Sequence, residues 1–274
     1  MCGINGIIAK TNRNRDEIST ILNTMNNLII HRGPDDDGLF SEENEQFSVG
    51  MAMRRLSIID LSSGKQPILS DDKQIVIVFN GEIYNYKVLK AKLEAEGVTF
   101  NTSSDTEVIL KAYEKYGVES FQWLDGMYGF SIYDKNINKL FIARDFFGEK
   151  PLYYTHTDNE FIWASELKSI INTIDFTPNI SKKGLNLYFR LTYIPAPHTI
   201  YENISKLEAN HYIEYDLATH NTTIHKINAE PKPKVNNISF EDAKSKTKDL
   251  VYKSVDSRSI ADVGLGTFLS GGVD

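Results

Sequence analysis

The single cysteine of this 274-residue chain, Cys2, lies directly in front of the first predicted strand. The residues behind it, Gly3-Ile4-Asn5-Gly6-Ile7-Ile8, form an apolar run with two glycines, which is typical of a buried strand entered by a close turn. Removal of Met1 would leave a thiol with a pKa of about 8.5 beside an α-amine with a pKa of about 8. The amine can then act as general base for the sulfur. We therefore predict that Cys2 is a nucleophile, against the alternative of an incidental residue on a frayed terminus.

Composition narrows the class of protein. With 41% hydrophobic and 24% charged residues, the composition is that of an ordinary globular protein. No stretch approaches the roughly 18 apolar residues that span a bilayer, and no leader pattern is present. One cysteine allows no intramolecular disulfide, and the net charge of −7 argues against a nucleic-acid backbone as partner. We expect a cytoplasmic protein that acts on small molecules, with no membrane and no nucleic-acid partner.

Hydrophobic periodicity predicts an α+β fold. Amphipathic patterns predict helices at 15–30, 86–96 and 106–116. Short apolar runs predict strands at 3–9, 47–53, 75–79, 127–133, 140–143, 152–154 and 161–163. Because the later strands follow one another at hairpin distances, we expect antiparallel sheets with helices packed on them. The acidic run at 35–37 lacks the spacing of a calcium loop and is predicted to be a turn.

A change of composition near residue 218 predicts a domain boundary. We predict a first domain at 1–218, a polar, proline-bearing linker at 219–237 and the start of a second domain at 238–274. Ser239, followed by two acidic residues, predicts the start of a helix. Residues 263–269 predict a buried strand, and the glycine-rich residues after it could present N–H groups to phosphates.

Two groups of polar residues are candidates for a site. Asn80 and Gly81 follow a predicted buried strand and could donate hydrogen bonds to an oxyanion, although the same dipeptide also suits a hairpin turn. A helix pattern and not a second strand follows, which favours the oxyanion hole. Arg55 could bind a carboxylate, and Glu82 and Asp105 could bind an ammonium, so that together they would select an α-amino acid. Asp105 also has an alternative interpretation as the N-cap of the helix at 106–116.

The order of these motifs resembles glutamine-hydrolysing asparagine synthetases. That family joins a class II glutamine amidotransferase, which has an N-terminal nucleophile, to an ATP-dependent amidating domain. One departure is the pair Ala52-Met53, where the family usually has glycine and histidine. The motifs that carry the resemblance are Met1-Cys2-Gly3-Ile4, His31-Arg32-Gly33-Pro34-Asp35, Arg55-Leu56-Ser57-Ile58-Ile59-Asp60, Asn80-Gly81-Glu82-Ile83-Tyr84-Asn85, Ser104-Asp105-Thr106-Glu107, Ala143-Arg144-Asp145, Lys150-Pro151-Leu152-Tyr153-Tyr154, Tyr193-Ile194-Pro195-Ala196-Pro197 and Ser270-Gly271-Gly272-Val273-Asp274.

The resemblance implies a fold and a glutaminase site. The fold is a four-layer αββα N-terminal-nucleophile hydrolase sandwich, followed by the first helix and strand of an α/β ATP-pyrophosphatase-type domain. Cys2 would attack the glutamine side-chain amide and form a thioester, with Asn80 and Gly81 as the oxyanion hole. Arg55 would bind the α-carboxylate, and Glu82 and Asp105 the α-ammonium. The pocket would be lined by the backbone of Leu56, Ser57, Ile58 and Ile59.

The resemblance also implies partners beyond this site. ATP and Mg²⁺ would serve the synthetase domain, whose pyrophosphate loop would match Leu269, Ser270, Gly271, Gly272 and Asp274, with no metal site in the glutaminase half. Ammonia would pass through a tunnel to aspartate. Apart from the resemblance, the exposed start of a second domain would favour association, and a homodimer is one of the states left open. We expect this chain alone to perform only the glutaminase step. The alternatives are an amidotransferase that serves another carboxylate, such as a sugar acid, and an inactive remnant that binds glutamine.

Overall fold

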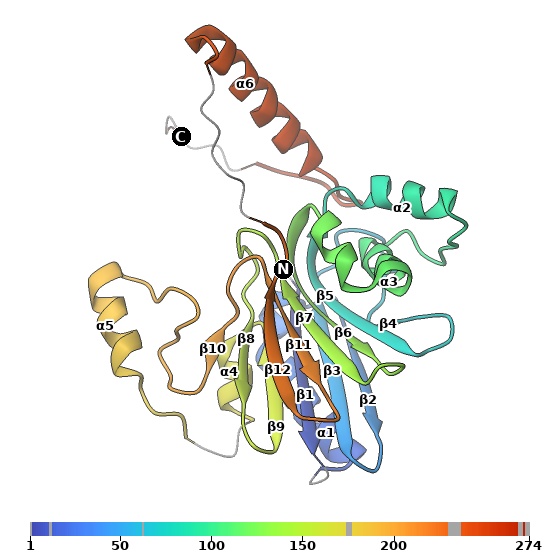
Figure 1. Cartoon of the computed structure of the whole chain (residues 1–274), viewed down its shortest axis with the longest axis vertical. Coiled ribbons are helices and arrows are strands. Elements are labelled where there is room, and N and C mark those ends of the chain that lie inside the picture. Colours follow the sequence, from blue (N-terminus) through green and yellow to red (C-terminus); the bar gives the residue numbers. More distant parts are fainter. Residues whose placement is uncertain are drawn as a thin grey trace.

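The computed structural model describes residues 2–10, 13–61, 63–173, 177–229, 237–267 and 271. Within these residues, two six-stranded antiparallel sheets stack face to face (Figure 1). The first sheet has the order β10 (Ser205–Lys206), β8 (Tyr153–His156), β9 (Glu160–Ala164), β1 (Gly3–Lys10), β3 (Phe47–Arg55) and β2 (Asp36–Glu43). The second has the order β12 (Asn221–Lys226), β11 (His211–Asp216), β7 (Lys139–Arg144), β6 (Gly126–Asp134), β5 (Ile75–Ile83) and β4 (Ile68–Leu69).

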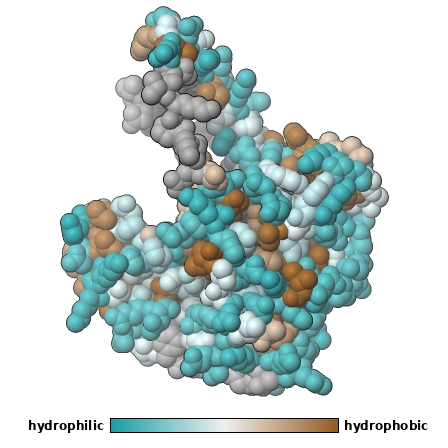
Figure 2. All heavy atoms as spheres, in the orientation of Figure 1, coloured by the Kyte–Doolittle hydropathy of each residue, from teal (hydrophilic) through white to brown (hydrophobic). Residues whose placement is uncertain are grey.

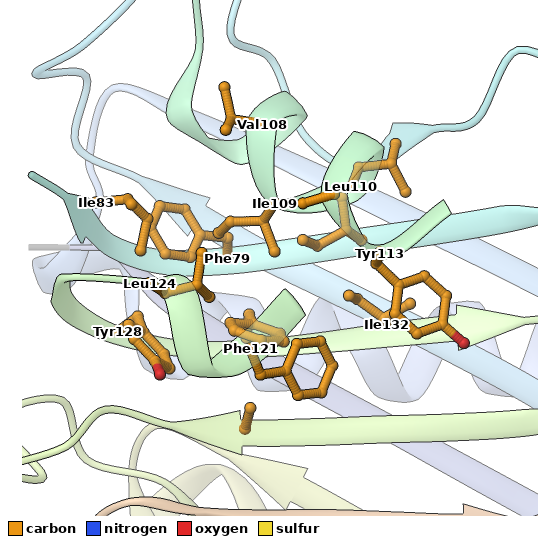
Figure 3. Close-up of a cluster of buried hydrophobic side chains, with 14 of the residues drawn as sticks. Phe79, Ile83, Val108, Ile109, Leu110, Tyr113, Phe121, Leu124, Tyr128 and Ile132 are labelled. Carbon is orange, nitrogen blue, oxygen red and sulfur yellow. The ribbon is translucent and has the colours of Figure 1, made fainter. Parts of the chain in front are cut away.

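Helices cover the outer face of each sheet. A hydrophobic cluster joins α1 (Arg15–Leu28) and α4 (Leu167–Ile171) to the first sheet. Another joins α2 (Tyr86–Ala95), α3 (Asp105–Tyr116) and the 3-10 helix Gly117–Trp123 to the second sheet (Figure 3). A third cluster, which includes the fully buried Trp163 and Tyr133, fills the space between the sheets. The α+β prediction and its four-layer αββα arrangement are therefore confirmed.

The strand register places the N-terminus at one end of the sandwich. In the pairing of β1 with β3, Gly3 lies opposite Arg54, so Cys2 and Arg55 lie at the same end of the first sheet. In the second sheet, Asn80 lies opposite Gly129 near the end of β5. The inter-sheet cluster contains residues of β1, β3 and β5, which brings these three strand ends together.

Three local predictions are wrong. Residues 221–226 form β12 and pair with β11, so the first half of the predicted linker belongs to the sheet. This edge strand is polar and mostly exposed, which is why its composition looks like a linker. Asp36 and Asp37 begin β2 rather than forming a turn. This strand is an edge strand of the first sheet. The described part of the predicted strand 263–269 is not a strand, and Val263 and Leu265 are exposed.

The helix α6 (Phe240–Ser257) projects from the sandwich (Figure 1). Ser239 caps it, as predicted, by accepting a hydrogen bond from the Asp242 N–H. None of its residues is buried, and its large apolar side chains include Leu250 and Tyr252. The helix α5 (Lys182–Leu191) forms a second projection with exposed apolar residues, whereas the visible face of the sandwich is mostly hydrophilic (Figure 2). In the described part of the chain, no helix is long and apolar enough to cross a membrane.

Candidate active site

Cys2 lines a cavity to which strands of both sheets contribute. Its sulfur is 3.3 Å from the Leu56 nitrogen, which donates to it, and 3.5 Å from the Leu56 carbonyl oxygen, to which it donates. The Arg32 Nε donates to the Cys2 carbonyl at 2.8 Å and fixes the residue's backbone. Burial raises the pKa of the Cys2 thiol. The Leu56 N–H and nearby positive charges lower this pKa, but by less. A thiol in this position needs a base before it can attack.

Asn80 and Gly81 face the same cavity from the second sheet. The Asn80 side chain is 1% exposed, and within the described residues neither its Nδ2 nor its Oδ1 has a hydrogen-bond partner. A buried amide without partners is costly, because water no longer satisfies it. A Cβ at Gly81 would lie 2.1 Å from the Met127 carbonyl oxygen, so only glycine fits against β6 here. The pair can therefore act as an oxyanion hole that donates hydrogen bonds to a substrate oxygen.

Arg55 is held beside this pair by a tight turn. Its Nη2 donates to the carbonyl oxygens of Ile59 at 3.0 Å and Asp60 at 2.6 Å. The side chain is 5% exposed, and Gly64 packs against it, where a Cβ would lie 2.6 Å from Nη2. With one edge of the guanidinium fixed by the turn, the group can present its other N–H groups to a carboxylate in the cavity.

Two carboxylates, those of Glu82 and Asp105, also line the cavity. Asp105 Oδ2 accepts a hydrogen bond from the Ile83 N–H at 3.0 Å, and burial raises the pKa of Asp105 to about 7. Burial also raises the pKa of Glu82, while the charge of Lys150 acts against this rise. The helix cap is Ser104, whose hydroxyl accepts from the Thr106 N–H, so the N-cap interpretation of Asp105 is wrong. An ammonium placed between these carboxylates would favour their charged forms.

The cavity collects most of the predicted site residues. Its volume is about 180 Å³, far more than the roughly 10–15 Å³ that one water needs. Ser57 is the exception among the predicted residues, because its N–H donates to Asp35 outside the lining. The predicted residues that line the cavity are Cys2, Arg55, Leu56, Ile58, Ile59, Asn80, Gly81, Glu82 and Asp105.

The predicted nucleotide loop cannot be placed in the same way. Leu269, Ser270, Gly272 and Asp274 lie outside the described residues. Gly271 is exposed, with open space around the position of a Cβ. No group of three or more His, Cys, Asp or Glu side chains in the described residues could hold a metal ion.

The comparisons with known proteins decide the family. Residues 1–226 match the model of the glutamine amidotransferase domain. The chain belongs to this family. The amidotransferase is 42% identical to a putative glutamine-hydrolysing asparagine synthetase 2 of Methanocaldococcus jannaschii, over its whole length and 55% of that protein. It is 40% identical to asparagine synthetase 1 of Bacillus subtilis, over its whole length and 42% of that protein. The chain thus spans about half the length of these relatives.

Solved structures support the fold of the amidotransferase. The glutamine phosphoribosylpyrophosphate amidotransferase of Bacillus subtilis matches with a TM-score of 0.59 and 19% identity, over 84% of this chain and 50% of that one. A structure titled as the allosteric regulatory enzyme of purine biosynthesis matches with a TM-score of 0.60 and 20% identity, over the same shares of the two chains. At this identity the likeness shows the N-terminal-nucleophile fold alone.

Several residues of the amidotransferase cavity were not predicted as site residues. Lys150 is 4% exposed and lines the cavity, and burial lowers its pKa. It stands in one of the motifs that carry the resemblance, so the motif was a signal for it. Gln66 bridges the Phe79 N–H and the Thr106 hydroxyl and has no comparable signal. Met53, which replaces the family's usual histidine, is buried between the sheets and does not line the cavity.

Proposed function

We propose that this chain, once Met1 is removed, hydrolyses L-glutamine to glutamate and ammonia through a thioester on Cys2. The observation that carries the proposal is one cavity that holds the Cys2 sulfur, the unpartnered Asn80 amide and Arg55 together with two carboxylates, the half-buried Glu82 and the buried Asp105. A nucleophile and oxyanion donors serve acyl transfer. A guanidinium facing two carboxylates fits the zwitterion of an α-amino acid.

The reaction begins with proton transfer from the thiol to the Cys2 α-amine. The raised pKa of Cys2 makes this base necessary, because the thiol is protonated at neutral pH. The sulfur then bonds to the amide carbon of glutamine, and the Asn80 Nδ2 and Gly81 N–H stabilise the negative oxygen. The protonated α-amine returns its proton to the leaving nitrogen, which departs as ammonia and leaves a thioester.

Hydrolysis of the thioester uses the same groups. A water molecule gives a proton to the α-amine and attacks the carbonyl carbon. The carbon–sulfur bond breaks, the proton returns to the sulfur, and glutamate is released. Throughout, Arg55 binds the α-carboxylate, while Glu82 and Asp105 bind the α-ammonium. The backbone of Leu56, Ile58 and Ile59 lines the cavity around the substrate.

In the whole enzyme, the ammonia would convert aspartate to asparagine. The names of the relatives support this proposal, and the chain spans about half their length. ATP, with Mg²⁺, would activate the aspartate carboxylate. A homodimer and a cytoplasmic location are part of the proposal, the latter supported by the single cysteine.

Ammonia release from glutamine by purified chain tests the glutaminase step. Mass spectrometry should first show that Met1 is absent, and Cys2→Ala serves as the inactive control. We expect turnover in the processed chain, and a glutamine-analogue electrophile should label Cys2 in a single burst. Absence of turnover in processed, folded chain would contradict the proposal. Asparagine formation from aspartate by a full-length enzyme would then distinguish aspartate from another carboxylate, such as a sugar acid.

A further inference from the structure

The chain that follows α6 packs, at Asp262, against the turn that lies beside the glutamine cavity. The Asp262 N–H donates to the Ile58 carbonyl oxygen at 2.9 Å. Its carboxylate Oδ2 accepts a hydrogen bond from the Asp60 N–H at 2.8 Å. One residue, 202 positions away in sequence from Asp60, therefore holds both ends of the turn Ile58–Asp60.

This turn is the part of the structure that fixes Arg55. The carbonyl oxygens of Ile59 and Asp60 accept the Arg55 Nη2 hydrogen bonds. Asp60 has a φ of +51°, a left-handed conformation that a residue with a side chain keeps only when its surroundings hold it. Its carboxylate is held on one side by Ser63 and Ser103, and Asp262 holds its backbone on the other. Asp262 thus supports the turn whose carbonyl oxygens hold the Arg55 guanidinium.

The same segment also contacts Tyr84, close in sequence to Glu82. The Arg258 guanidinium lies 4.8 Å from the centroid of the Tyr84 ring, and Tyr84 follows Glu82 by two residues. Ile260 packs on the cluster of α2, α3 and the second sheet. In Figure 1, the end of α6 from which this segment continues lies beside α2. Residues 258–262 therefore contact the segments that carry both the carboxylate-binding and the ammonium-binding groups.

We propose that Asp262 is a positioning residue for glutamine: it holds the turn Ile58–Asp60 and, through it, the Arg55 guanidinium that binds the α-carboxylate. Asp262 does not line the cavity and lies beyond residue 226, where the family match ends. The region after α6 thereby sets the affinity of the glutaminase site. This inference rests on the proposed glutaminase function and adds to it a contact from outside the matched domain.

Kinetics of Asp262→Ala test the inference. Loss of a charge-assisted hydrogen bond to an exposed carboxylate should raise the KM for glutamine about 3- to 10-fold, with kcat within about 2-fold of wild type. Asp262→Asn keeps an oxygen that can accept from the Asp60 N–H, so its KM should stay close to that of wild type. Asp256→Ala, which removes an exposed aspartate of α6, is the matched control and should leave both constants unchanged. An unchanged KM in Asp262→Ala would overturn the inference.

A second measurement separates positioning from a general loss of folding. Hydrogen exchange of the Asp60 amide should become faster in Asp262→Ala, while the amides of β1 and β5 keep their protection. Unchanged exchange at Asp60, or equal loss of protection throughout the sandwich, would contradict the positioning role. The two proposals also fail differently: no turnover in wild-type chain contradicts the glutaminase function, whereas an active wild type beside an unaffected Asp262→Ala contradicts only the inference.

Discussion

The two sides of the glutamine cavity are held in place by different means. On the strand side, Cys2, Asn80 and Gly81 lie at the ends of β1 and β5, whose positions are fixed by ladder register and by buried clusters on both faces. On the loop side, Arg55 ends β3, and its guanidinium is fixed by the carbonyl oxygens of a turn. The Asp60 carboxylate in this turn accepts hydrogen bonds from the N–H groups of Ser63 and Ser103, and the Asp60 N–H donates to the Asp262 carboxylate. The reacting groups are therefore held by strand pairing and packing, and the substrate-binding cation by the hydrogen bonds of one turn. Changes on the strand side should lower kcat, and changes on the loop side should raise KM.

The largest expected effect on the strand side comes from blocking the α-amine of Cys2. A chain that carries a short uncleaved extension in front of Cys2 keeps its thiol but has an amide nitrogen in place of the base. Loss of a general base costs about 10²- to 10⁴-fold in rate, so we expect kcat for glutamine to fall by that factor. Removal of the extension by a protease that leaves Cys2 at the terminus should restore activity. Full activity of the extended chain would show that another group is the base.

Asn80→Ala should have the next largest effect. Removal of one oxyanion donor lowers kcat by about 10²- to 10³-fold, and KM for glutamine should change little because the amide acts in the transition state. The substitution also removes a buried amide that has no partner in the free cavity, so thermal stability should not fall. Asn23→Ala, on the exposed face of α1, is the matched control for steady-state kinetics. A rise in KM with unchanged kcat would place Asn80 in substrate binding instead.

The layers of the sandwich could be predicted from the sequence because buried strands are apolar along their whole length. The runs at 75–79 and 127–133 are of this kind, and they are the central strands β5 and β6. Edge strands could not be found in the same way. The alternation in β12 is weak, since its residues are mostly exposed and only its pairing with β11 makes it a strand. Polar composition at a sheet edge and in a linker looks the same.

The reacting groups of the site could be predicted, but the support of those groups could not. Cys2 directly precedes β1 and Asn80 lies near the end of β5, and a polar residue type beside or within a buried strand is itself a signal. Gln66 and Asp262 give no such signal, because each lies in a loop whose position depends on contacts distant in sequence. Asp262 becomes informative only after folding brings it to Ile58 and Asp60.

On the loop side, Arg55→Lys should raise the KM for glutamine about 10- to 100-fold. Lysine keeps the charge but has no planar fork, so it cannot bond the turn carbonyls and a carboxylate at the same time. We expect kcat at saturating glutamine to fall less than KM rises, because Cys2 and Asn80 lie on the strand side. Arg54→Lys is the matched control, since the Arg54 side chain bonds Asn26 and Asn27 and does not line the cavity. A lower kcat with a normal KM in Arg55→Lys would contradict the expectation that changes on the loop side act on KM.

The smallest expected effect is a pH dependence of glutamine binding set by Asp105. Burial raises the pKa of Asp105 to about 7, and its ionised form binds the ammonium, so KM should rise about 10-fold as pH falls from about 8 to about 6. Asp105→Asn should have a higher KM that changes little over this range. The folding stability should change with pH in the opposite direction to glutamine affinity, so that it rises as the pH falls. The folded-state pKa lies above the model value of 3.8, so the buried carboxylate lowers stability at and above pH 7 and has no such effect below about pH 4. Asp105→Asn should therefore unfold at a higher temperature than wild type at pH 8 but not at pH 4, while the Asn oxygen still accepts the Ile83 N–H. A wild-type KM that stays constant from pH 8 to pH 6 would mean that this carboxylate does not bind the substrate.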